Sequence, residues 1–192
     1  KGIKHNYEKH CIDNNLDLLP LLGLQHPSKK IPYRVYLNDR HLLNAEKFFR
    51  EHGITKRNLF GIHTGSGTTK NLILKRWPFE YYGEFIRRLL TDYPSFRILL
   101  FTGPEEIQEN TRLCQRLQDD RVVMVQTGHI LDAAAILGHC SYFLSVDGVF
   151  MHLAAAVHVP KQIVIRSAAY SDAVVPCRKD FVEIGCPLPK GV

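Results

Sequence analysis

The feature of this sequence that most constrains its fold is an alternation of short apolar runs with segments of helical periodicity, from residue 58 to residue 165. Runs of four or five apolar residues predict buried strands, and apolar residues spaced three or four positions apart predict helices. Tyr82, Ile86 and Leu89 show the helical spacing most clearly. Strands that alternate with crossover helices are typical of the α/β class, so we predict a doubly wound parallel sheet.

The pattern defines nine elements in this region. The predicted strands are Leu59–Ile62, Ile98–Phe101, Val122–Val125, Tyr142–Val146 and Gln162–Ile165. The predicted helices are Phe79–Tyr93, Glu105–Leu117, Leu131–Leu137 and Phe150–Val157. Ligands of open sheets bind at the carboxyl ends of the strands, so a functional site is expected in the strand-to-helix loops.

The residues before this region have a different organisation. Regularly spaced leucines predict a helix from Asn14 to Leu24, with Gly23 as its C-cap. Residues 25–38 contain two prolines and predict an extended linker, after which Asn38 or Asp39 can cap a further helix. We therefore expect a terminal helix over residues 1–24, a linker over 25–38 and an α/β domain over 39–192.

Length and composition set the scale of the fold. The chain has 192 residues, of which 45% are hydrophobic and 23% charged, which suffices for one core but is short for two complete domains. No run of about 18 apolar residues predicts a membrane span. Five cysteines lie far apart without CxxC or His/Cys ligand spacing, which argues against a disulfide framework and structural zinc. This cysteine usage favours a reducing, cytoplasmic location, and we expect no metal site.

The charge balance bears on the partners. The formal net charge is +6, from 25 Lys and Arg against 19 Asp and Glu spread along the chain. Such a surface is compatible with an anionic ligand or an anionic membrane, and equally with ordinary solvated charge. The sequence has no long basic tract interleaved with aromatics, so nucleic acid is not an expected partner.

The loop after the first predicted strand has the composition of a phosphate-binding loop. It reads His63-Thr64-Gly65-Ser66-Gly67-Thr68-Thr69-Lys70 and continues to Lys75-Arg76-Trp77-Pro78. Glycines and small hydroxyl residues let backbone N–H groups close around an anion, and Lys75 adds a cation near a helix start. The loop lacks P-loop spacing, and a Gly-Ser loop can also simply turn the chain.

The second and third loops carry weaker signals. The second reads Thr102-Gly103-Pro104-Glu105-Glu106. A carboxylate beyond a glycine turn can accept hydrogen bonds from a ribose, although acidic residues in a first helical turn are also favoured by the helix dipole. The third loop, Gln126 to Leu131, can offer a wall to a nucleobase or be an ordinary turn.

The fourth loop is the most specific of the set. It reads Asp147-Gly148-Val149-Phe150-Met151-His152 and leads into a helix of small residues. Small residues allow close approach to a helix N-terminus, whose partial positive charge favours a phosphate or a sugar hydroxyl held by Asp147. Taken singly, Asp147 can be an N-cap and His152 a core histidine, but the combination favours a site.

Together these segments resemble the ADP-heptose:lipopolysaccharide heptosyltransferase family, inverting glycosyltransferases built from two Rossmann-like domains. The family pattern is a strand with a small-residue loop, Lys-x-Trp-Pro, a Gly-rich turn with Pro and Glu, and Asp-x-Gly-x-x-His before an Ala-rich helix and a proline. The matching segments are Gly61-Ile62-His63-Thr64-Gly65, Lys75-Arg76-Trp77-Pro78, Gly103-Pro104-Glu105-Glu106, Asp147 to Ala156, and Val159-Pro160. The chain is similar to the carboxy-terminal, donor-binding half of such an enzyme.

The resemblance implies roles for residues of the first two loops. Thr64 and Gly65 would line the donor diphosphate. Lys75 would neutralise the diphosphate and act in catalysis, and Glu106 would hold the ribose.

It also implies donor-binding residues on the other two loops. Thr127 and His129 would belong to the nucleobase region, and Asp147 with Gly148 would face the sugar and phosphates. His152 would lie in the first turns of the phosphate-facing helix, with its role open.

The implied chemistry needs neither metal nor cofactor, because a helix N-terminus and a lysine stabilise the nucleoside-diphosphate leaving group. Inversion needs a general base on the acceptor hydroxyl, which the family places in its amino-terminal domain. We expect that domain to lie outside this chain, so that the chain binds its donor, ADP-heptose by resemblance, without turnover. The implied acceptor is lipopolysaccharide or another glycan, reached in the cytoplasm with peripheral contact to the inner membrane.

Three departures from the family pattern leave the donor sugar open. Val149 replaces the second glycine, residues 68–74 lengthen the first loop, and Arg166-Ser167-Ala168 replaces Gly-Pro-Ser/Thr. A nicotinamide-dependent dehydrogenase or a sugar-nucleotide epimerase would need a tight G-x-G-x-x-G turn after the first strand, and that spacing is absent. A non-catalytic nucleotide-binding or interaction module on the same fold stays open.

Overall fold

The structure is a computed structural model that describes residues 2–27, 33–66, 76–166, 174–176 and 180–185. Six strands in this part of the chain pair in parallel, in the order β3-β2-β1-β4-β5-β6. They are β1 (Leu59–His63), β2 (Arg97–Phe101), β3 (Val122–Val125), β4 (Tyr142–Val146), β5 (Lys161–Arg166) and β6 (Val182–Gly185). The first five confirm the predicted strands to within one residue at each end, and the order is that of a doubly wound sheet.

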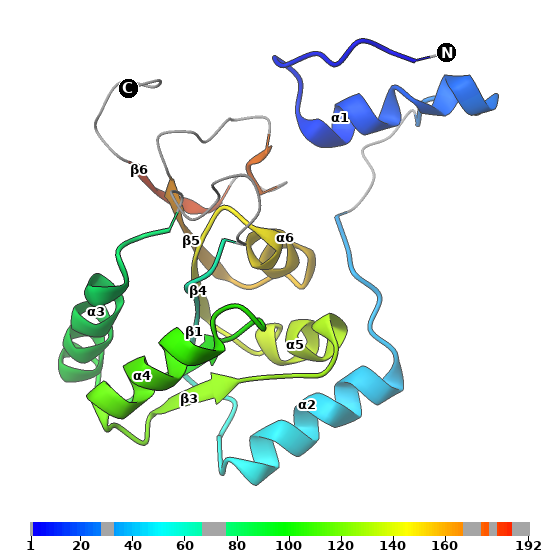
Figure 1. Cartoon of the computed structure of the whole chain (residues 1–192). Helices are drawn as coiled ribbons and strands as arrows, with labels where there is room; N and C mark the ends of the chain where they lie inside the picture. Colours follow the sequence, from blue (N-terminus) through cyan, green and yellow to red (C-terminus); the bar gives the residue numbers. More distant parts are fainter. Residues whose placement is uncertain (1, 28–32, 67–75, 167–173, 177–179, 186–192) are drawn as a thin grey trace.

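Helices cover both faces of the sheet (Figure 1). One face carries α3 (Phe79–Asp92) and α4 (Ile107–Leu117), and the other carries α2 (Asp39–Glu51), α5 (Ile130–Leu137) and α6 (Val149–Ala156). Successive strand residues point to opposite faces, so on β1 Phe60 and Ile62 pack in the core under α3, whereas Leu59 packs in the core under α2 and α5. The predicted doubly wound α/β fold is therefore confirmed.

The central strand β1 passes between aromatic side chains. A methyl group built on Gly61 would lie 2.7 Å from the Phe143 ring, 3.0 Å from the Phe101 ring and 3.1 Å from Cys140 Sγ. Because Gly61 has no side chain, Phe101 and Phe143 meet edge to face with ring centroids 5.8 Å apart. This packing fixes β1 against β2 and β4, the strands that precede two of the four loops.

The starts of α2 and α4 differ in how they are capped. The Asn38 side chain accepts a hydrogen bond from the His41 N–H, which confirms the cap predicted for α2. α4 begins at Ile107, two residues later than predicted, and its N-cap residue Glu106 does not cap the helix with its side chain, since the carboxylate accepts from the Gly103 N–H instead. Among the described helices, none combines the length and apolarity needed to cross a bilayer.

The amino-terminal segment differs from the single helix that was predicted. It forms a short helix α1 (Cys11–Leu16) followed by a 3-10 helix η1 (Leu19–Leu22). Pro20 explains the break, because it has no N–H to donate and its ring clashes with the carbonyl four residues earlier, at Leu16. Gly23 ends η1 in the left-handed conformation, with φ 75°, in agreement with its predicted C-cap role.

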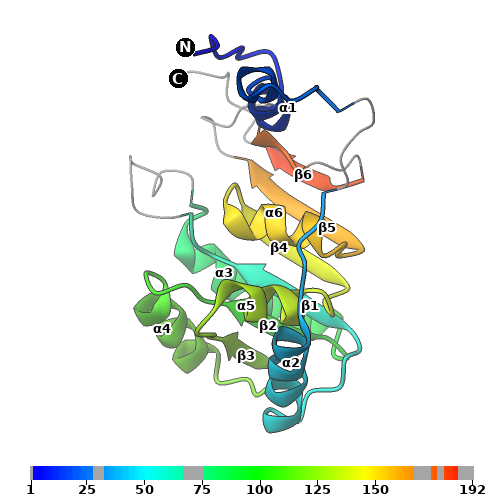
Figure 2. The same cartoon turned by 90° about the vertical axis from the view of Figure 1, so that its right-hand side faces the viewer.

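The chain then runs from α1, beside β6, along α6 and α5 to α2 at the other end of the molecule (Figure 2). The described residues of this connection, 25–27 and 33–38, contain no helix or strand. The His10 ring Nε2 lies 3.0 Å from the Val175 carbonyl oxygen, and the Tyr33 ring meets the His152 ring at 6.1 Å. No residue of α1 or η1 is buried, so this segment contributes little to the core.

The edge strand β6 was not predicted. It has only four residues, all of them exposed, and Glu183 separates Val182 from Ile184. Such a short run resembles an ordinary loop in sequence. Its pairing with β5 extends the sheet by one parallel strand.

Candidate functional site

The carboxyl ends of the strands meet at one edge of the sheet. The register places His63 at the end of β1 opposite Phe101 of β2 and Ser145 of β4. The strand order reverses between β1 and β4, and a ligand crevice is expected at such a reversal. The loops that follow these two strands are neighbours, since a methyl group built on Gly148 would lie 4.0 Å from the Gly65 carbonyl oxygen.

A chain of buried hydrogen bonds ties the first loop to the second. Thr64 Oγ1 donates to Asn110 Oδ1 at 3.0 Å, and Asn110 Nδ2 donates to Thr102 Oγ1 at 2.9 Å. Thr102 Oγ1 donates in turn to the Leu100 carbonyl at 2.9 Å. Asn110 lies on α4 and is fully buried, and Thr64 is only 3% exposed. The Thr64 side chain therefore points into the protein, and its backbone is the part that can face a ligand.

The carboxylate of Glu106 lies between a glycine of the first loop and a glycine of the second. A methyl group built on Gly65 would overlap Glu106 Oε1, and one built on Gly103 would lie 2.6 Å from Oε2. The Gly103 N–H donates to Oε2 at 3.1 Å, and Glu106 is only 4% exposed. A side chain at position 65 would thus displace the carboxylate, so packing alone requires a glycine there.

One guanidinium faces three carboxylates beside this glycine pair. Arg76 Nη2 lies 3.2 Å from Glu106 Oε1, Nη1 lies 3.3 Å from Glu109 Oε2, and Glu105 is 4.0 Å away. Burial raises the pKa of Glu106 above its ordinary value, and the Arg76 charge acts in the opposite sense. The Arg76 side chain is 13% exposed, so the Glu106 pair is largely shielded from water.

His63 ends β1 beneath the first loop. Its ring packs against Phe150 with 4.4 Å between ring centroids, and Nε2 lies 4.0 Å from Glu106 Oε2. Burial, reinforced by the Arg76 charge, lowers the pKa of His63 to about 4. The ring is therefore neutral at neutral pH, and its contact with Glu106 is not an ion pair.

At the fourth loop, the N-cap position of α6 is a glycine, which has no side chain to cap the helix. Gly148 is the N-cap residue, in an extended conformation with φ 174°. Asp147 immediately precedes this N-cap position. Uncapped N–H groups at the start of a helix can bind an anion. Val149 adopts ordinary helical geometry and is 56% exposed, so the backbone here does not require the glycine of the family pattern.

His152 lies one turn further along α6 and is half-buried. Burial lowers its pKa, while the nearby Asp147 carboxylate opposes this shift. The contact of its ring with Tyr33 turns it toward the connecting segment rather than into the core.

The third loop forms a turn that caps α5. Thr127 Oγ1 donates to the His129 carbonyl at 3.0 Å, and His129 Nδ1 accepts a hydrogen bond from the α5 backbone at 3.1 Å. The His129 ring stacks on His41 of α2 with 5.2 Å between centroids, and His41 Nδ1 lies 2.8 Å from Asp132 Oδ1. Burial would raise the pKa of Asp132, but hydrogen bonds from His41 and Asn44 outweigh it and hold that pKa below its ordinary value. The third loop is thereby tied to α2.

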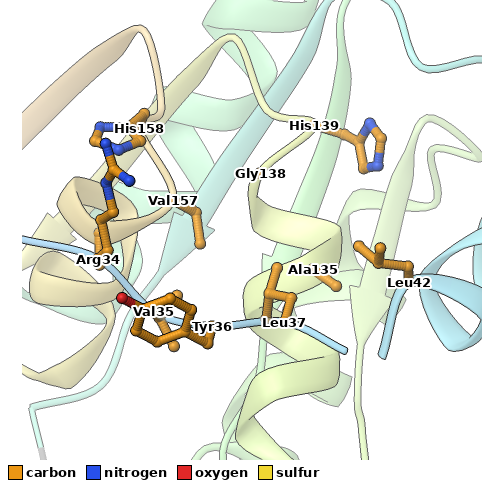
Figure 3. A pocket seen from close by; sticks show the side chains of 11 residues that line it. Arg34, Val35, Tyr36, Leu37, Leu42, Ala135, Gly138, His139, Val157 and His158 are labelled. Carbon is orange, nitrogen blue, oxygen red and sulfur yellow. The ribbon is translucent and has the colours of Figure 1, made fainter. Parts of the chain in front are cut away.

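A separate cavity of about 530 Å³ lies between residues 34–37 and the helices α5 and α6 (Figure 3). It is lined by Ala135 and Gly138, near the end of α5, and by Val157, just after α6. These helix ends lead into β4 and β5, so the cavity lies at the edge of the sheet opposite the four loops. It is therefore not part of the candidate site.

The family model for glycosyltransferase family 9 (heptosyltransferase) matches residues 1–165. This chain belongs to glycosyltransferase family 9. The match includes all four strand-end loops and the amino-terminal segment, and it confirms the resemblance found in the sequence motifs. No curated protein matches the sequence significantly.

Solved structures of family 9 have the same fold. The family 9 glycosyltransferase of Veillonella parvula matches with a TM-score of 0.77 and 17% identity, over 97% of this chain and 51% of that chain. ADP-heptose LPS heptosyltransferase II of E. coli matches with a TM-score of 0.64 and 15% identity, over 86% and 48%. E. coli heptosyltransferase WaaC, solved with ADP, matches with a TM-score of 0.60 and 22% identity, over 97% and 52%. The chain thus spans about half the length of these relatives.

Within this family 9 fold, the structure brings only some of the predicted residues together. Thr64, Gly65 and Glu106 meet at the first two loops, and Gly148 lies against Gly65. Thr127 and His129 lie on the separate turn at α5, and Lys75 falls outside the described residues.

Three residues of the candidate site were not among the predicted site residues: His63, Arg76 and Asn110. A signal was available for Asn110, since it occupies a polar position on the face of α4 that continues with Leu113 and Leu117. No spacing rule indicates that Arg76 turns toward Glu106.

Proposed function

We propose that this chain is the donor-binding part of a family 9 glycosyltransferase, and that its donor is ADP-heptose, transferred with inversion. The observation that carries the proposal is the start of α6, where the N-cap residue Gly148 has no side chain and lies beside the Gly65 carbonyl at the reversal of strand order. A diphosphate placed there would accept hydrogen bonds from both backbone segments.

On this proposal, positive charge at the diphosphate comes mainly from Lys75 and the helix dipole. Arg76 is already paired with three carboxylates and is not available as a phosphate ligand in this arrangement. As the glycosidic bond breaks, negative charge develops on the departing diphosphate, and a lysine together with a helix N-terminus stabilises it. We assign that catalytic role to Lys75.

The remaining roles follow the positions of the loops. Asp147 and Gly148 would face the sugar and the adjoining phosphate, with His152 behind them on α6. Thr127 and His129 would border the nucleobase. Glu106 would accept a hydrogen bond from a ribose hydroxyl, using the carboxylate lone pairs that are not engaged by Gly103 and Arg76.

The rest of the reaction would depend on parts of the enzyme beyond this chain. Inversion requires a general base at the acceptor hydroxyl, and we place that base in the other half of a family 9 enzyme. The acceptor would be lipopolysaccharide or a related glycan at the cytoplasmic face of the inner membrane. On this proposal neither a metal nor a cofactor takes part, and the chain alone binds donor without transferring its sugar.

Thermal unfolding with added nucleotides tests the proposal. ADP at about 100 times its Kd should stabilise the chain by roughly 2.7 kcal/mol, because a ligand that binds only the native state raises the unfolding midpoint. UDP and GDP should stabilise it less. Lys75→Ala should weaken ADP binding far more than adenosine binding, because it removes a phosphate contact.

The control variant is Lys47→Ala on α2, whose side chain is 61% exposed and forms an ion pair with Glu51. It should keep wild-type affinity for ADP. If no nucleoside diphosphate shifts the midpoint, the chain is a non-catalytic module and the proposal is wrong. Appreciable sugar transfer by the chain alone would contradict the assignment of the general base.

A further inference from the structure

We propose that Asn110 is a positioning residue for the donor phosphates, acting through the first loop without touching the ligand. The inference rests on the proposed donor site and extends it to a residue of α4, which none of the sequence motifs includes. Asn110 is fully buried, and its amide joins the loop after β1 to the loop after β2.

The hydrogen-bond directions fix which side chain can do this. The Thr102 hydroxyl proton is directed to the Leu100 carbonyl, so Thr102 can take part only as an acceptor toward α4. The Thr64 hydroxyl donates, so its partner must accept. An amide supplies one acceptor and one donor on the same planar group, whereas a carboxylate lacks the donor and an aliphatic side chain lacks both.

Burial makes this arrangement specific. Thr64 is 3% exposed and Thr102 is 7% exposed, so water has little access to either hydroxyl. A polar atom that loses its partner in such a place stays unsatisfied, and the network therefore favours a single geometry of both loops.

The position of Thr64 determines that of the residue proposed to face the phosphates. Gly65 follows Thr64 directly, its missing side chain makes room for Glu106, and its carbonyl oxygen lies next to Gly148 at the start of α6. Displacement of Thr64 would shift the Gly65 backbone relative to α6, and the two halves of the proposed phosphate site would no longer converge.

Calorimetric titration of the purified chain tests the inference. Asn110→Leu keeps the side-chain volume but removes both hydrogen bonds, and Thr102→Val removes the far end of the network. Both should weaken ADP binding by about tenfold, the equivalent of roughly 1.4 kcal/mol or one net hydrogen bond. Adenosine, which has no phosphate, should bind each variant within about twofold of wild type, a selectivity that general loosening of the fold would not produce. The matched control is Gln115→Leu on the exposed face of α4, which should leave both affinities unchanged.

A double-mutant cycle separates positioning from direct contact. If Asn110 acts through Thr64, Thr64→Val and Asn110→Leu combined should weaken ADP binding no more than either change alone. Additive losses, or an Asn110→Leu variant that binds ADP like wild type, would overturn the inference. If Asn110→Leu does not fold, the Thr102→Val titration decides in the same way. A wild-type chain that binds no ADP would instead contradict the proposed function.

Discussion

At the scale of single residues, Gly65 is the position of the candidate site that leaves least room for change. Gly65→Ala should lower the free energy of unfolding by about 1–3 kcal/mol, because its methyl group would overlap the buried Glu106 carboxylate. Denaturant unfolding measures the loss, and titration should show weaker ADP binding as well. Gly128→Ala is the control, since a methyl group there meets nothing within 4 Å, and it should change the stability by less than about 0.5 kcal/mol.

The lowered pKa of His63 predicts that the stability of the fold depends on pH. Its pKa is about 4 in the folded chain against an ordinary 6.5, so the unfolded chain binds the proton more readily. This difference in pKa stabilises the folded chain by roughly 3 kcal/mol. The stabilisation is complete above pH 6.5 and is lost as the pH falls to about 4. In His63→Gln this part of the acid destabilisation should be absent, as measured by urea unfolding at several pH values.

The raised pKa of Glu106 acts in the opposite direction, because it favours the folded state at low pH. The informative quantity is therefore the difference between wild type and His63→Gln at each pH. His5→Gln, at an exposed histidine, should reproduce the wild-type profile. Parallel profiles for wild type and His63→Gln would show that the His63 ring is not held neutral by burial.

At the scale of elements, replacing either of two glycines in regular structure by alanine should change the stability, in opposite directions. Gly61→Ala in β1 should cost about 1–3 kcal/mol, because its methyl group would collide with Phe143 and Phe101. Gly83→Ala in α3 should stabilise by about 0.5–1 kcal/mol, because alanine favours a helix and its closest contact, Leu113 Cδ1, is at 3.4 Å. Thermal and denaturant unfolding measure both, and equal effects of the two changes would contradict the packing described for β1.

The elements that were predicted well are those whose pattern is decided locally. The apolar runs predicted for β1 and β2 are buried on both faces, so burial and sequence agree. The prediction of one helix over residues 14–24 was wrong, because Pro20 interrupts the helix that the leucine spacing indicates. β6 could not be predicted, since its only support is pairing with β5.

The sequence predicts which loops form the candidate site, but it does not predict the side-chain contacts within that site. Parallel topology alone places Gly65 and Gly148 at one edge, because both follow strands of the same sheet. The inward direction of Thr64 and the pairing of Arg76 with Glu106 depend on residues 30 or more positions apart. No local pattern encodes such distances.

At the scale of the whole molecule, the chain belongs to family 9 and spans about half the length of the solved structures that it matches. In the described segment ahead of α2, the apolar residues Leu18, Leu21, Leu22 and Leu24 are exposed. The domain itself is held by β1, which contacts β2 and β4 and carries the tightest packing at Gly61.

The exposed edge at β6 affects how these molecules behave toward one another in solution. Val182 and Ile184 are both more than half exposed, and the carboxylate between them, Glu183, is paired with Arg166 at 2.8 Å. Charges along an outer strand normally repel a second copy and prevent edge-to-edge growth of the sheet. Here the ion pair cancels that repulsion, so the colloidal stability of concentrated samples should depend on this one strand, and added salt, which screens the pair, should alter it.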